Sequence, residues 1–174
     1  ANIKKGDKVL IMGAGTIGVL AMFAAKLFGA KVYVSDIAQG KLDYASKLGA
    51  DGIILNSSVE AFEDKVNEIT KGDGFDVTIE AVGLPSTFQS CIDAVAFGGK
   101  VVQIGIGKSN IDFNFTMIQK KELNIFGSRN ALKEDFEQLI ECVSKGEVDL
   151  EKIITNTYSA YEAGKAFEDR KSVV

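Results

Sequence analysis

The sequence predicts an α/β fold, in which helices cover both faces of a parallel β-sheet. Short apolar runs of four to six residues alternate with longer segments of helical periodicity from residue 8 onward. The 18 glycines, against a single proline, suit tight turns between strands and helices. Because parallel neighbours need a crossover, repeated strand–helix–strand units with short links predict a doubly wound parallel sheet.

The elements follow one another in regular order. The first strand is expected at residues 8–12 (KVLIM), a nearly continuous apolar run typical of a strand buried on both faces. The first helix is expected at 16–28, because its apolar residues recur at helical spacing before Gly29 ends it. Five further strands are predicted at 31–35, 52–55, 76–79, 100–104 and 122–126, and helices between them at 41–48, 59–69 and 87–97. From about residue 131 the pattern changes to a helix ending at Lys145, a short link, a segment at 152–158 and a helix at 161–169.

Composition narrows the function classes. A net charge of −4 argues against a nucleic-acid partner, since no basic face can dominate the field of the molecule. Neither a signal peptide nor an apolar run long enough for a membrane span is present, so we expect a cytoplasmic protein. Cys91 and Cys142 stand 51 residues apart in helical patterns and are interpreted as reduced, buried residues. The chain has no histidine, so the commonest general base and metal ligand are both missing.

The motif with the clearest chemistry is Gly13-Ala-Gly15-Thr-Ile-Gly18. It directly follows the first predicted strand and opens the first helix, which is the context that dinucleotide binding requires. Gly13 allows the tight turn, Gly15 lets the backbone approach a pyrophosphate, and Gly18 lets the helix pack on the strand. The helix N-terminus adds unpaired N–H groups and a positive dipole end. The alternative is a glycine-rich turn that binds nothing.

Asp36 follows the second strand, 18 residues after Gly18. A carboxylate at this point accepts hydrogen bonds from the adenosine ribose and repels the extra phosphate of NADP, so NAD is favoured. Lys41 is near enough in sequence to reach the same ribose. Asp36 is also a reasonable helix cap, and Lys41 a reasonable surface residue. These residues alone do not exclude a methyltransferase, whose doubly wound sheet also has a glycine turn and an acidic residue after strand two.

At this point the sequence resembles the medium-chain dehydrogenase/reductase family, in particular its zinc-dependent alcohol and polyol dehydrogenases of the sorbitol/iditol or threonine dehydrogenase type. The resemblance rests on six ordered segments that span nearly the whole chain: GDKVLIMGAGTIG (6–18), KVYVSD (31–36), LGAD (48–51), GDGFDVTIEAVG (72–83), GGKVVQIGIG (98–107) and ELNIFGSR (122–129). It implies a three-layer Rossmann fold with six parallel strands in the order 3-2-1-4-5-6. It also implies an NAD-binding Rossmann domain at residues 1–150, and at 151–174 the start of a segment that returns to an absent GroES-like catalytic domain.

The resemblance also assigns cofactor-binding residues. The glycine turn (residues 13–18) would hold the pyrophosphate, and the strand ends would hold the ribose, adenine and nicotinamide. Arg129 would reach a cofactor phosphate. The residues carried over are Gly13, Gly15, Thr16, Ile17, Gly18, Asp36, Lys41, Ala81, Val82, Ile104, Gly105, Ile106, Asn124, Phe126 and Arg129. Val82, Ile104 and Phe126 are equally consistent with core strand positions, and Arg129 with a solvated surface charge.

In the parent enzyme the resemblance implies NAD-dependent oxidation of a secondary alcohol or polyol, with zinc present in the full-length parent only and a homo-oligomer formed through the sheet edge. The isolated chain is then expected to be inactive, because no catalytic residue or metal ligand is assigned within it. The terminal SVV run (172–174) begins without a partner, which suggests a chain that stops inside the return segment. Asn156 stands where many relatives have a histidine. Two alternatives remain open, a free-standing NAD-sensing module and a zinc-free quinone-reductase-type relative; Asp36 counts against the second, which usually prefers NADPH.

Overall fold

A computed structural model describes residues 1–107 and 109–172 of the chain, with the side chains of 170–172 excepted. The chain divides into two compact units, Ala1–Asn130 and Ala131–Val174. The predicted terminal apolar run falls partly on residues 173–174, which lie outside the described residues.

The first unit is built on one six-stranded sheet. Its strands are β1 (Lys8–Met12), β2 (Lys31–Asp36), β3 (Gly52–Leu55), β4 (Phe75–Glu80), β5 (Val95–Gln103) and β6 (Asn124–Gly127). They lie in the order β3-β2-β1-β4-β5-β6, and every pair of neighbours is parallel. This order confirms the predicted doubly wound Rossmann fold.

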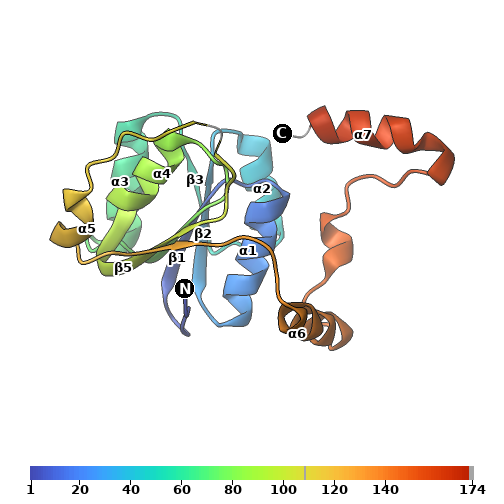
Figure 1. Ribbon diagram of the computed structural model, residues 1–174, viewed down its shortest axis with the longest axis horizontal. Coiled ribbons are helices and arrows are strands. Elements are labelled where there is room, and N and C mark those ends of the chain that lie inside the picture. Colours follow the sequence, from blue (N-terminus) through green and yellow to red (C-terminus); the bar gives the residue numbers. More distant parts are fainter. Residues whose placement is uncertain (108, 173–174) are drawn as a thin grey trace. The chain divides into compact units, whose positions relative to one another are not determined.

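Helices form the two outer layers of this unit (Figure 1). They are α1 (Thr16–Leu27), α2 (Gln39–Lys47), α3 (Val59–Thr70), α4 (Pro85–Ala94) and the short α5 (Thr116–Lys120). In Figure 1, α1 and α2 lie on one side of the sheet, and α3 and α4 lie on the other. Right-handed crossovers produce this arrangement, because the strand order reverses between β1 and β4.

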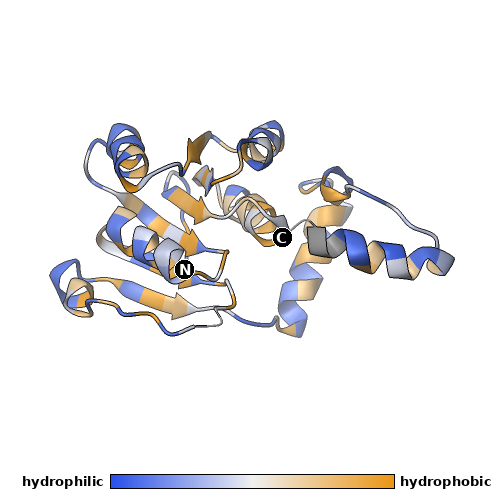
Figure 2. Ribbon diagram, turned by 90° about the horizontal axis from the view of Figure 1, so that it is seen from above, coloured by the Kyte–Doolittle hydropathy of each residue, from blue (hydrophilic) through white to orange (hydrophobic). Residues whose placement is uncertain are grey.

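Strands β1, β2 and β4 are largely buried between these layers, as their apolar runs predicted, whereas every residue of the edge strand β6 is exposed. Val9, Leu10, Val32, Val34 and Val77 have no exposed surface at all. Figure 2 shows the hydrophobic residues gathered in the strands, with the hydrophilic residues on the outer sides of the helices. At roughly 25 cal/mol per Å² of apolar surface removed from water, this burial is the main stabilising contribution to the unit.

The boundary between α4 and β5 differs from the sequence prediction, which extended the helix to residue 97. The helix ends at Ala94, and Val95 is already extended and pairs with Phe75. The ammonium of Lys121 donates to the carbonyl oxygens of Ile92, Asp93 and Val95 at 3.0, 2.8 and 2.9 Å, which satisfies the end of the helix. A residue 26 positions further along the chain therefore fixes this boundary, and local periodicity does not contain that information.

The second unit contains α6 (Lys133–Ser144), two short 3₁₀ turns at Leu150–Ile153 and Ala160–Glu162, and α7 (Ala163–Ser172). Its apolar side chains are mostly exposed: Phe136 is 59% and Ile140 67% accessible. The contacts of this unit with itself therefore do not bury the apolar face of α6.

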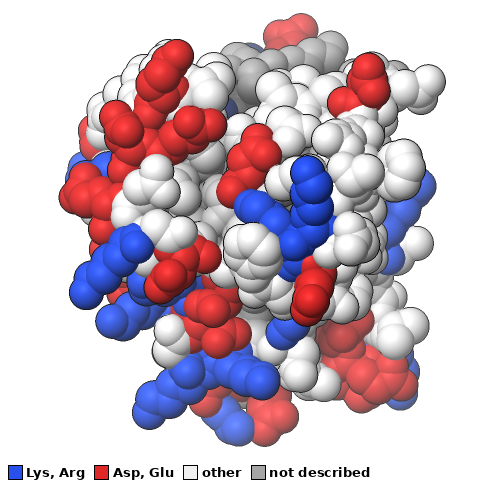
Figure 3. Space-filling model, turned by 90° about the vertical axis from the view of Figure 1, so that its left-hand side faces the viewer, with Lys and Arg blue, Asp and Glu red and all other residues white. Residues whose placement is uncertain are grey.

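Charged side chains of both signs share the surface. On the face drawn in Figure 3, Lys and Arg lie among Asp and Glu, and neither sign covers the face alone. Within the described residues, no helix is both long enough and apolar enough to cross a membrane.

Candidate cofactor site

The candidate site lies at the carboxyl edge of the sheet, where the strand order reverses between β1 and β4. In open α/β sheets, the crevice outside this point is where ligands bind. The glycine turn follows β1, and a second turn, residues 81–83 (the β4 turn), follows β4. These two turns face each other, because β1 and β4 are paired up to Met12 and Glu80.

The glycine turn has the backbone geometry that its sequence predicted. Gly13 has a φ of +104°, a left-handed conformation that favours glycine, and its N–H donates to the Ser35 carbonyl at 2.7 Å. A Cβ at Gly13 would lie 2.8 Å from Cγ2 of Val82, so the turn packs directly on the β4 turn. A Cβ at Gly18 would overlap the carbonyl oxygen of Gly13, so α1 lies hard against the turn.

Gly15 differs from both of these glycines. A Cβ at Gly15 would meet nothing within 4 Å, and its φ of −74° is open to any residue. Gly15 is also the N-cap of α1, with no side-chain cap and no acidic residue in the first helical turn. The backbone at Gly15 therefore borders an open space, at the end of the helix where free N–H groups and the helix dipole favour an anion.

Asp36 lies against the glycine turn. Its Oδ2 accepts the N–H of Ala14 at 2.8 Å, and its Oδ1 accepts the N–H of Ala38 at 2.9 Å. Each carboxylate oxygen has a second lone pair, so the group still has capacity to accept a ligand hydroxyl. Lys41, half-buried, lies in the first turn of α2 and follows this carboxylate closely in the chain.

The β4 turn forms the opposite wall. Val82 is 44% exposed, and Gly83 has a φ of +89° and would place a Cβ 2.7 Å from the carbonyl oxygen of Ile106. The N–H groups of Ile104 and Gly105 both donate to the carbonyl oxygen of Glu80 at 2.9 Å. The segment after β5, residues 104–106 (the β5 segment), is therefore held directly against the β4 turn.

A buried carboxylate that the sequence analysis missed lies beneath both segments. Glu80 has no exposed surface, and its side chain accepts hydrogen bonds from the backbone of the β4 turn, from Thr87 and from Gln103. The signal in the sequence was a charged residue that ends the strand directly before Ala81-Val82-Gly83. Such a residue is costly to bury unless it is fully hydrogen-bonded, which points to a local role.

The predicted residues of β6 are spread along that strand. Asn124 is level with Lys100, near the amino end of the paired region, and Phe126 is level with Val102. Arg129 follows the strand at the carboxyl edge and is exposed. The structure thus brings together the glycine turn, Asp36, the β4 turn and the β5 segment, whereas Asn124 is the predicted residue furthest from that edge.

Beside the β4 turn is a pocket of about 190 Å³, lined by Gly83, Leu84, Pro85, Phe88, Gln103, Gly107, Ser109 and Ile111. It lies on the α4 side of the β4 turn, and most of its lining is apolar. The pocket therefore adjoins the crevice without containing the glycine turn.

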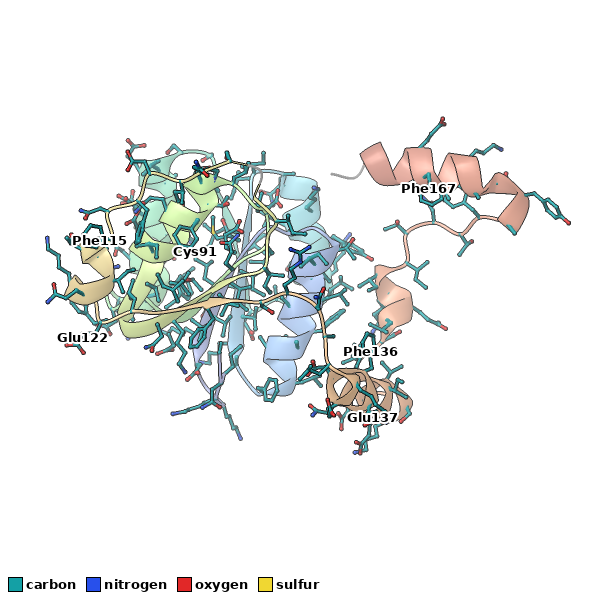
Figure 4. All side chains as sticks on the ribbon, in the orientation of Figure 1. Cys91, Phe115, Glu122, Phe136, Glu137 and Phe167 are labelled. Atoms are coloured by element: carbon teal, nitrogen blue, oxygen red, sulfur yellow. The ribbon has the colours of Figure 1, made fainter. Side chains whose placement is uncertain are left out.

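The residues needed for a metal site are not gathered in the described part of the chain, where no three His, Cys, Asp or Glu side chains are placed to hold an ion. Cys91 lies on α4 over the sheet (Figure 4), fully buried. Burial raises the pKa of its thiol far above the ordinary value, and the charge of Glu80 adds to the rise. Because metals bind the thiolate, Cys91 is unsuited to be a ligand.

Comparison with known proteins supports the same family. D-xylulose reductase A of Aspergillus oryzae is 35% identical over 176 residues, which cover 99% of this chain and 49% of that protein. Sorbitol dehydrogenase of Halalkalibacterium halodurans is 32% identical and is matched over 98% of this chain and 50% of its own length. The chain spans about half the length of these curated relatives.

Solved structures agree. A zinc dependent alcohol dehydrogenase 2 from Streptococcus pneumonia superposes with a TM-score of 0.93 at 26% identity, over 98% of this chain and 49% of that one. A short chain alcohol dehydrogenase from E. coli complexed with NADH has a TM-score of 0.86 at 28% identity, over 95% of this chain and 49% of that one. The family model described as zinc-binding dehydrogenase matches residues 16–145, most of the chain. The resemblance inferred from the sequence is confirmed, and the chain belongs to the zinc-binding dehydrogenase family.

Proposed function

We propose that the chain binds NAD(H) at the carboxyl edge of its sheet, as the cofactor-binding half of a dehydrogenase that oxidises a secondary alcohol or polyol. The observation that carries the proposal is the open space at Gly15, where α1 begins without a side-chain cap. A pyrophosphate there would meet backbone N–H groups and the positive end of the helix dipole. In Rossmann folds, dinucleotides bind in the crevice at this edge of the sheet, with the pyrophosphate at the N-terminus of the first helix.

Each further group has a part in this proposal. Asp36 would accept the adenosine ribose hydroxyls, with Lys41 beside it, and Ala81 and Val82 would line the adenosine side of the crevice. The β5 segment would hold the nicotinamide side. Backbone groups of Asn124 and Phe126 would bond the carboxamide, and Arg129 would reach a phosphate. When bound, NAD supplies the hydride acceptor; the residues of this chain bind and orient it.

Zinc does not fit the described residues of this chain, because they offer no cluster of ligands. We propose that zinc ligands and the substrate pocket belong to the part of the relatives that this chain does not match. The names of the curated relatives, a xylulose reductase and a sorbitol dehydrogenase, favour a polyol as the substrate of the whole protein.

Two further proposals concern location and assembly. The cysteines Cys91 and Cys142 are both free, which favours a reducing compartment such as the cytoplasm. Strand β6 is an edge strand with every residue exposed, so a second copy could pair there to form a homo-oligomer. Analytical ultracentrifugation tests this assembly: a purely monomeric chain at micromolar concentration contradicts it.

The test of cofactor binding compares NAD with NADP by calorimetric titration. A 2′-phosphate near Asp36 places two anions about 4 Å apart, which at an effective dielectric constant of about 20 costs roughly 4 kcal/mol before relaxation. We expect the chain to prefer NAD, and Asp36→Ser to narrow the preference because the repulsion is removed.

Asp43→Ser is the matched control, since Asp43 is an exposed carboxylate on α2 that accepts a hydrogen bond from Gln39. The control should leave the preference unchanged. Equal affinity of the unaltered chain for NAD and NADP would contradict the assignment of Asp36, and a preference for NADP would favour the zinc-free branch of the family.

A further inference from the structure

The buried carboxylate of Glu80 accepts hydrogen bonds from four neutral groups. Its Oε1 accepts the N–H groups of Val82 and Gly83, both at 2.9 Å, and the hydroxyl of Thr87 at 2.6 Å. Its Oε2 accepts Nε2 of Gln103 at 2.6 Å and a longer bond from the Gly83 N–H at 3.1 Å. Among the described residues, no Lys or Arg forms an ion pair with it. Neutral donors alone therefore compensate for burying this carboxylate.

The two oxygens of Glu80 face different segments. Oε1 holds the β4 turn and the first turn of α4, through Val82, Gly83 and Thr87. Oε2 faces Gln103, whose Nε2 also donates to the carbonyl oxygen of Gly105 at 2.7 Å. A chain of hydrogen bonds thus runs from Glu80 through Gln103 to the β5 segment.

The β5 segment also packs directly on the carboxylate. A Cβ at Gly105 would overlap both Oε2 of Glu80 and the backbone nitrogen of Gly83. No space remains for a ligand between the carboxylate and the segment, and Glu80 has no exposed surface. Glu80 therefore cannot touch a cofactor in the crevice and acts only through the segments around it.

We propose that Glu80 is a positioning residue that sets the affinity for the nicotinamide half of the cofactor by fixing the β5 segment through Gln103. This inference rests on the proposed function, since it assumes that a dinucleotide binds across the crevice. It assigns to Oε2 the placement of the β5 segment, and to Oε1 the placement of the β4 turn.

The orientation of the Gln103 amide allows the roles of the two Glu80 oxygens to be tested separately. In the orientation that the structure has, Nε2 donates to two acceptors, while Oε1 is buried and has no hydrogen-bond partner among the described residues. A reversed amide would set its oxygen against both the Glu80 carboxylate and the Gly105 carbonyl. With Glu80 in place, Gln103 is therefore held in this orientation.

The substitution that follows is Glu80→Gln, which keeps the volume of the side chain. The amide oxygen of the new residue can still accept from Val82 and Gly83, so the β4 turn is retained. Its NH₂ group then faces Nε2 of Gln103, two donors in contact. If the Gln103 amide reverses to accept from this NH₂, its oxygen meets the Gly105 carbonyl oxygen instead of a donor meeting it. In either orientation one of the two hydrogen bonds that tie position 80 to the β5 segment is lost, and the segment shifts. The expected loss of affinity is therefore confined to the nicotinamide half of the cofactor.

The experiment titrates two probes into the unaltered 174-residue chain and the variant: NADH, and ADP, which has the adenosine and the pyrophosphate but no nicotinamide. We expect Glu80→Gln to weaken NADH about tenfold and ADP less than twofold, and to reduce the enhanced fluorescence of the bound nicotinamide. Gln103→Leu removes the same link from the other side and should give the same split. In the Gln103→Leu background, Glu80→Gln should add little, because the opposed donor is gone.

The possible results distinguish a failure of this inference from a failure of the proposed function on which it rests. If the unaltered chain binds neither NADH nor ADP, the proposed function fails and the inference with it. If it binds both, and the variants weaken NADH and ADP by the same factor or change neither, the positioning role of Glu80 is wrong. If Glu80→Gln does not fold, the split measured with Gln103→Leu decides the question alone.

Discussion

The two turns that face each other across the crevice are both tied down by a carboxylate, but in different ways. The glycine turn is held from the neighbouring strand by Asp36, which is half-buried and bonds the N–H of Ala14. The β4 turn is held from its own strand by Glu80, which is fully buried. Asp36 can therefore meet a ligand directly, whereas Glu80 can act only through its neighbours.

The glycines of the two turns also differ in whether they leave space for a ligand. In the β4 turn and the β5 segment, Gly83 and Gly105 have no room for a Cβ, because each lies against backbone. In the glycine turn, Gly18 is equally confined but Gly15 is open. Most of these glycines thus serve close packing, and only Gly15 leaves space in which a ligand can approach the backbone.

The largest expected effect is on folding, from Gly18→Ala. The new Cβ overlaps the carbonyl oxygen of Gly13, and neither backbone can move without disturbing the join between β1 and α1. We expect a loss of about 3 kcal/mol in the free energy of unfolding, the upper end of overpacking effects, although alanine has the better helix propensity. Urea denaturation followed by circular dichroism measures it.

Gly40→Ala is the control, since Gly40 lies in α2 with nothing within 4 Å of a Cβ. That variant should be as stable as the unaltered chain or slightly more stable. A Gly18→Ala chain with unchanged stability would show that the glycine turn is not confined as described.

The second prediction concerns a glycine-to-alanine substitution at Gly15, three positions before Gly18. Gly15→Ala should leave the free energy of unfolding nearly unchanged, because the site is open and its φ is ordinary. The methyl group would instead occupy the space in which a pyrophosphate approaches the backbone. We expect the affinity for NADH and for ADP to fall about tenfold each, or roughly 1.4 kcal/mol. An unchanged affinity for both probes would place the pyrophosphate elsewhere.

Sequence patterns were sufficient for the sheet and the glycine turn because both depend on local features. The apolar runs form the strands, most of them buried, and the glycine spacing of residues 13–18 encodes a turn whose conformation is set within six residues. The six strands were all predicted, although β6 begins at Asn124, two residues later than expected. The short α5 was not predicted, and five residues are too few for helical periodicity to show.

The features that sequence reasoning missed depend on partners distant in the chain. The role of Glu80 requires Gln103, 23 residues later, and the end of α4 requires Lys121. Neither partner is recognisable before the strands are paired, because the pairing of β4 with β5 brings Gln103 to Glu80, and the pairing of β5 with β6 brings Lys121 to the end of α4. The roles of the predicted cofactor residues remain predictions that the titrations above can test.

The smallest expected effect is on the acid stability of the chain, through the carboxylate of Asp51, which has a charged partner. Asp51 precedes β3, and its Oδ2 accepts the N–H of Val32 at 2.7 Å and Nζ of Lys26 at 2.9 Å. Partial burial raises the pKa of this carboxyl, but the hydrogen bond from Val32 and the charge of Lys26 outweigh it, so the pKa is lowered overall. Unlike Glu80, Asp51 thus combines a backbone donor with a cation.

A lowered pKa in the folded state gives stability that is present above the pKa of the unfolded chain, about 3.9, and lost as the pH falls through the folded value. Asp51→Asn keeps an acceptor for Val32 but removes the charge. We expect its stability deficit to be constant from pH 7 to about pH 5 and to shrink below about pH 4, as measured by urea denaturation at each pH. Because burial raises the pKa by more than the Val32 bond alone lowers it, the net lowering depends on Lys26, and Lys26→Met should remove most of this acid sensitivity. If Lys26→Met leaves it in place, the backbone donor rather than the cation holds the charge of Asp51, as backbone donors hold those of Asp36 and Glu80.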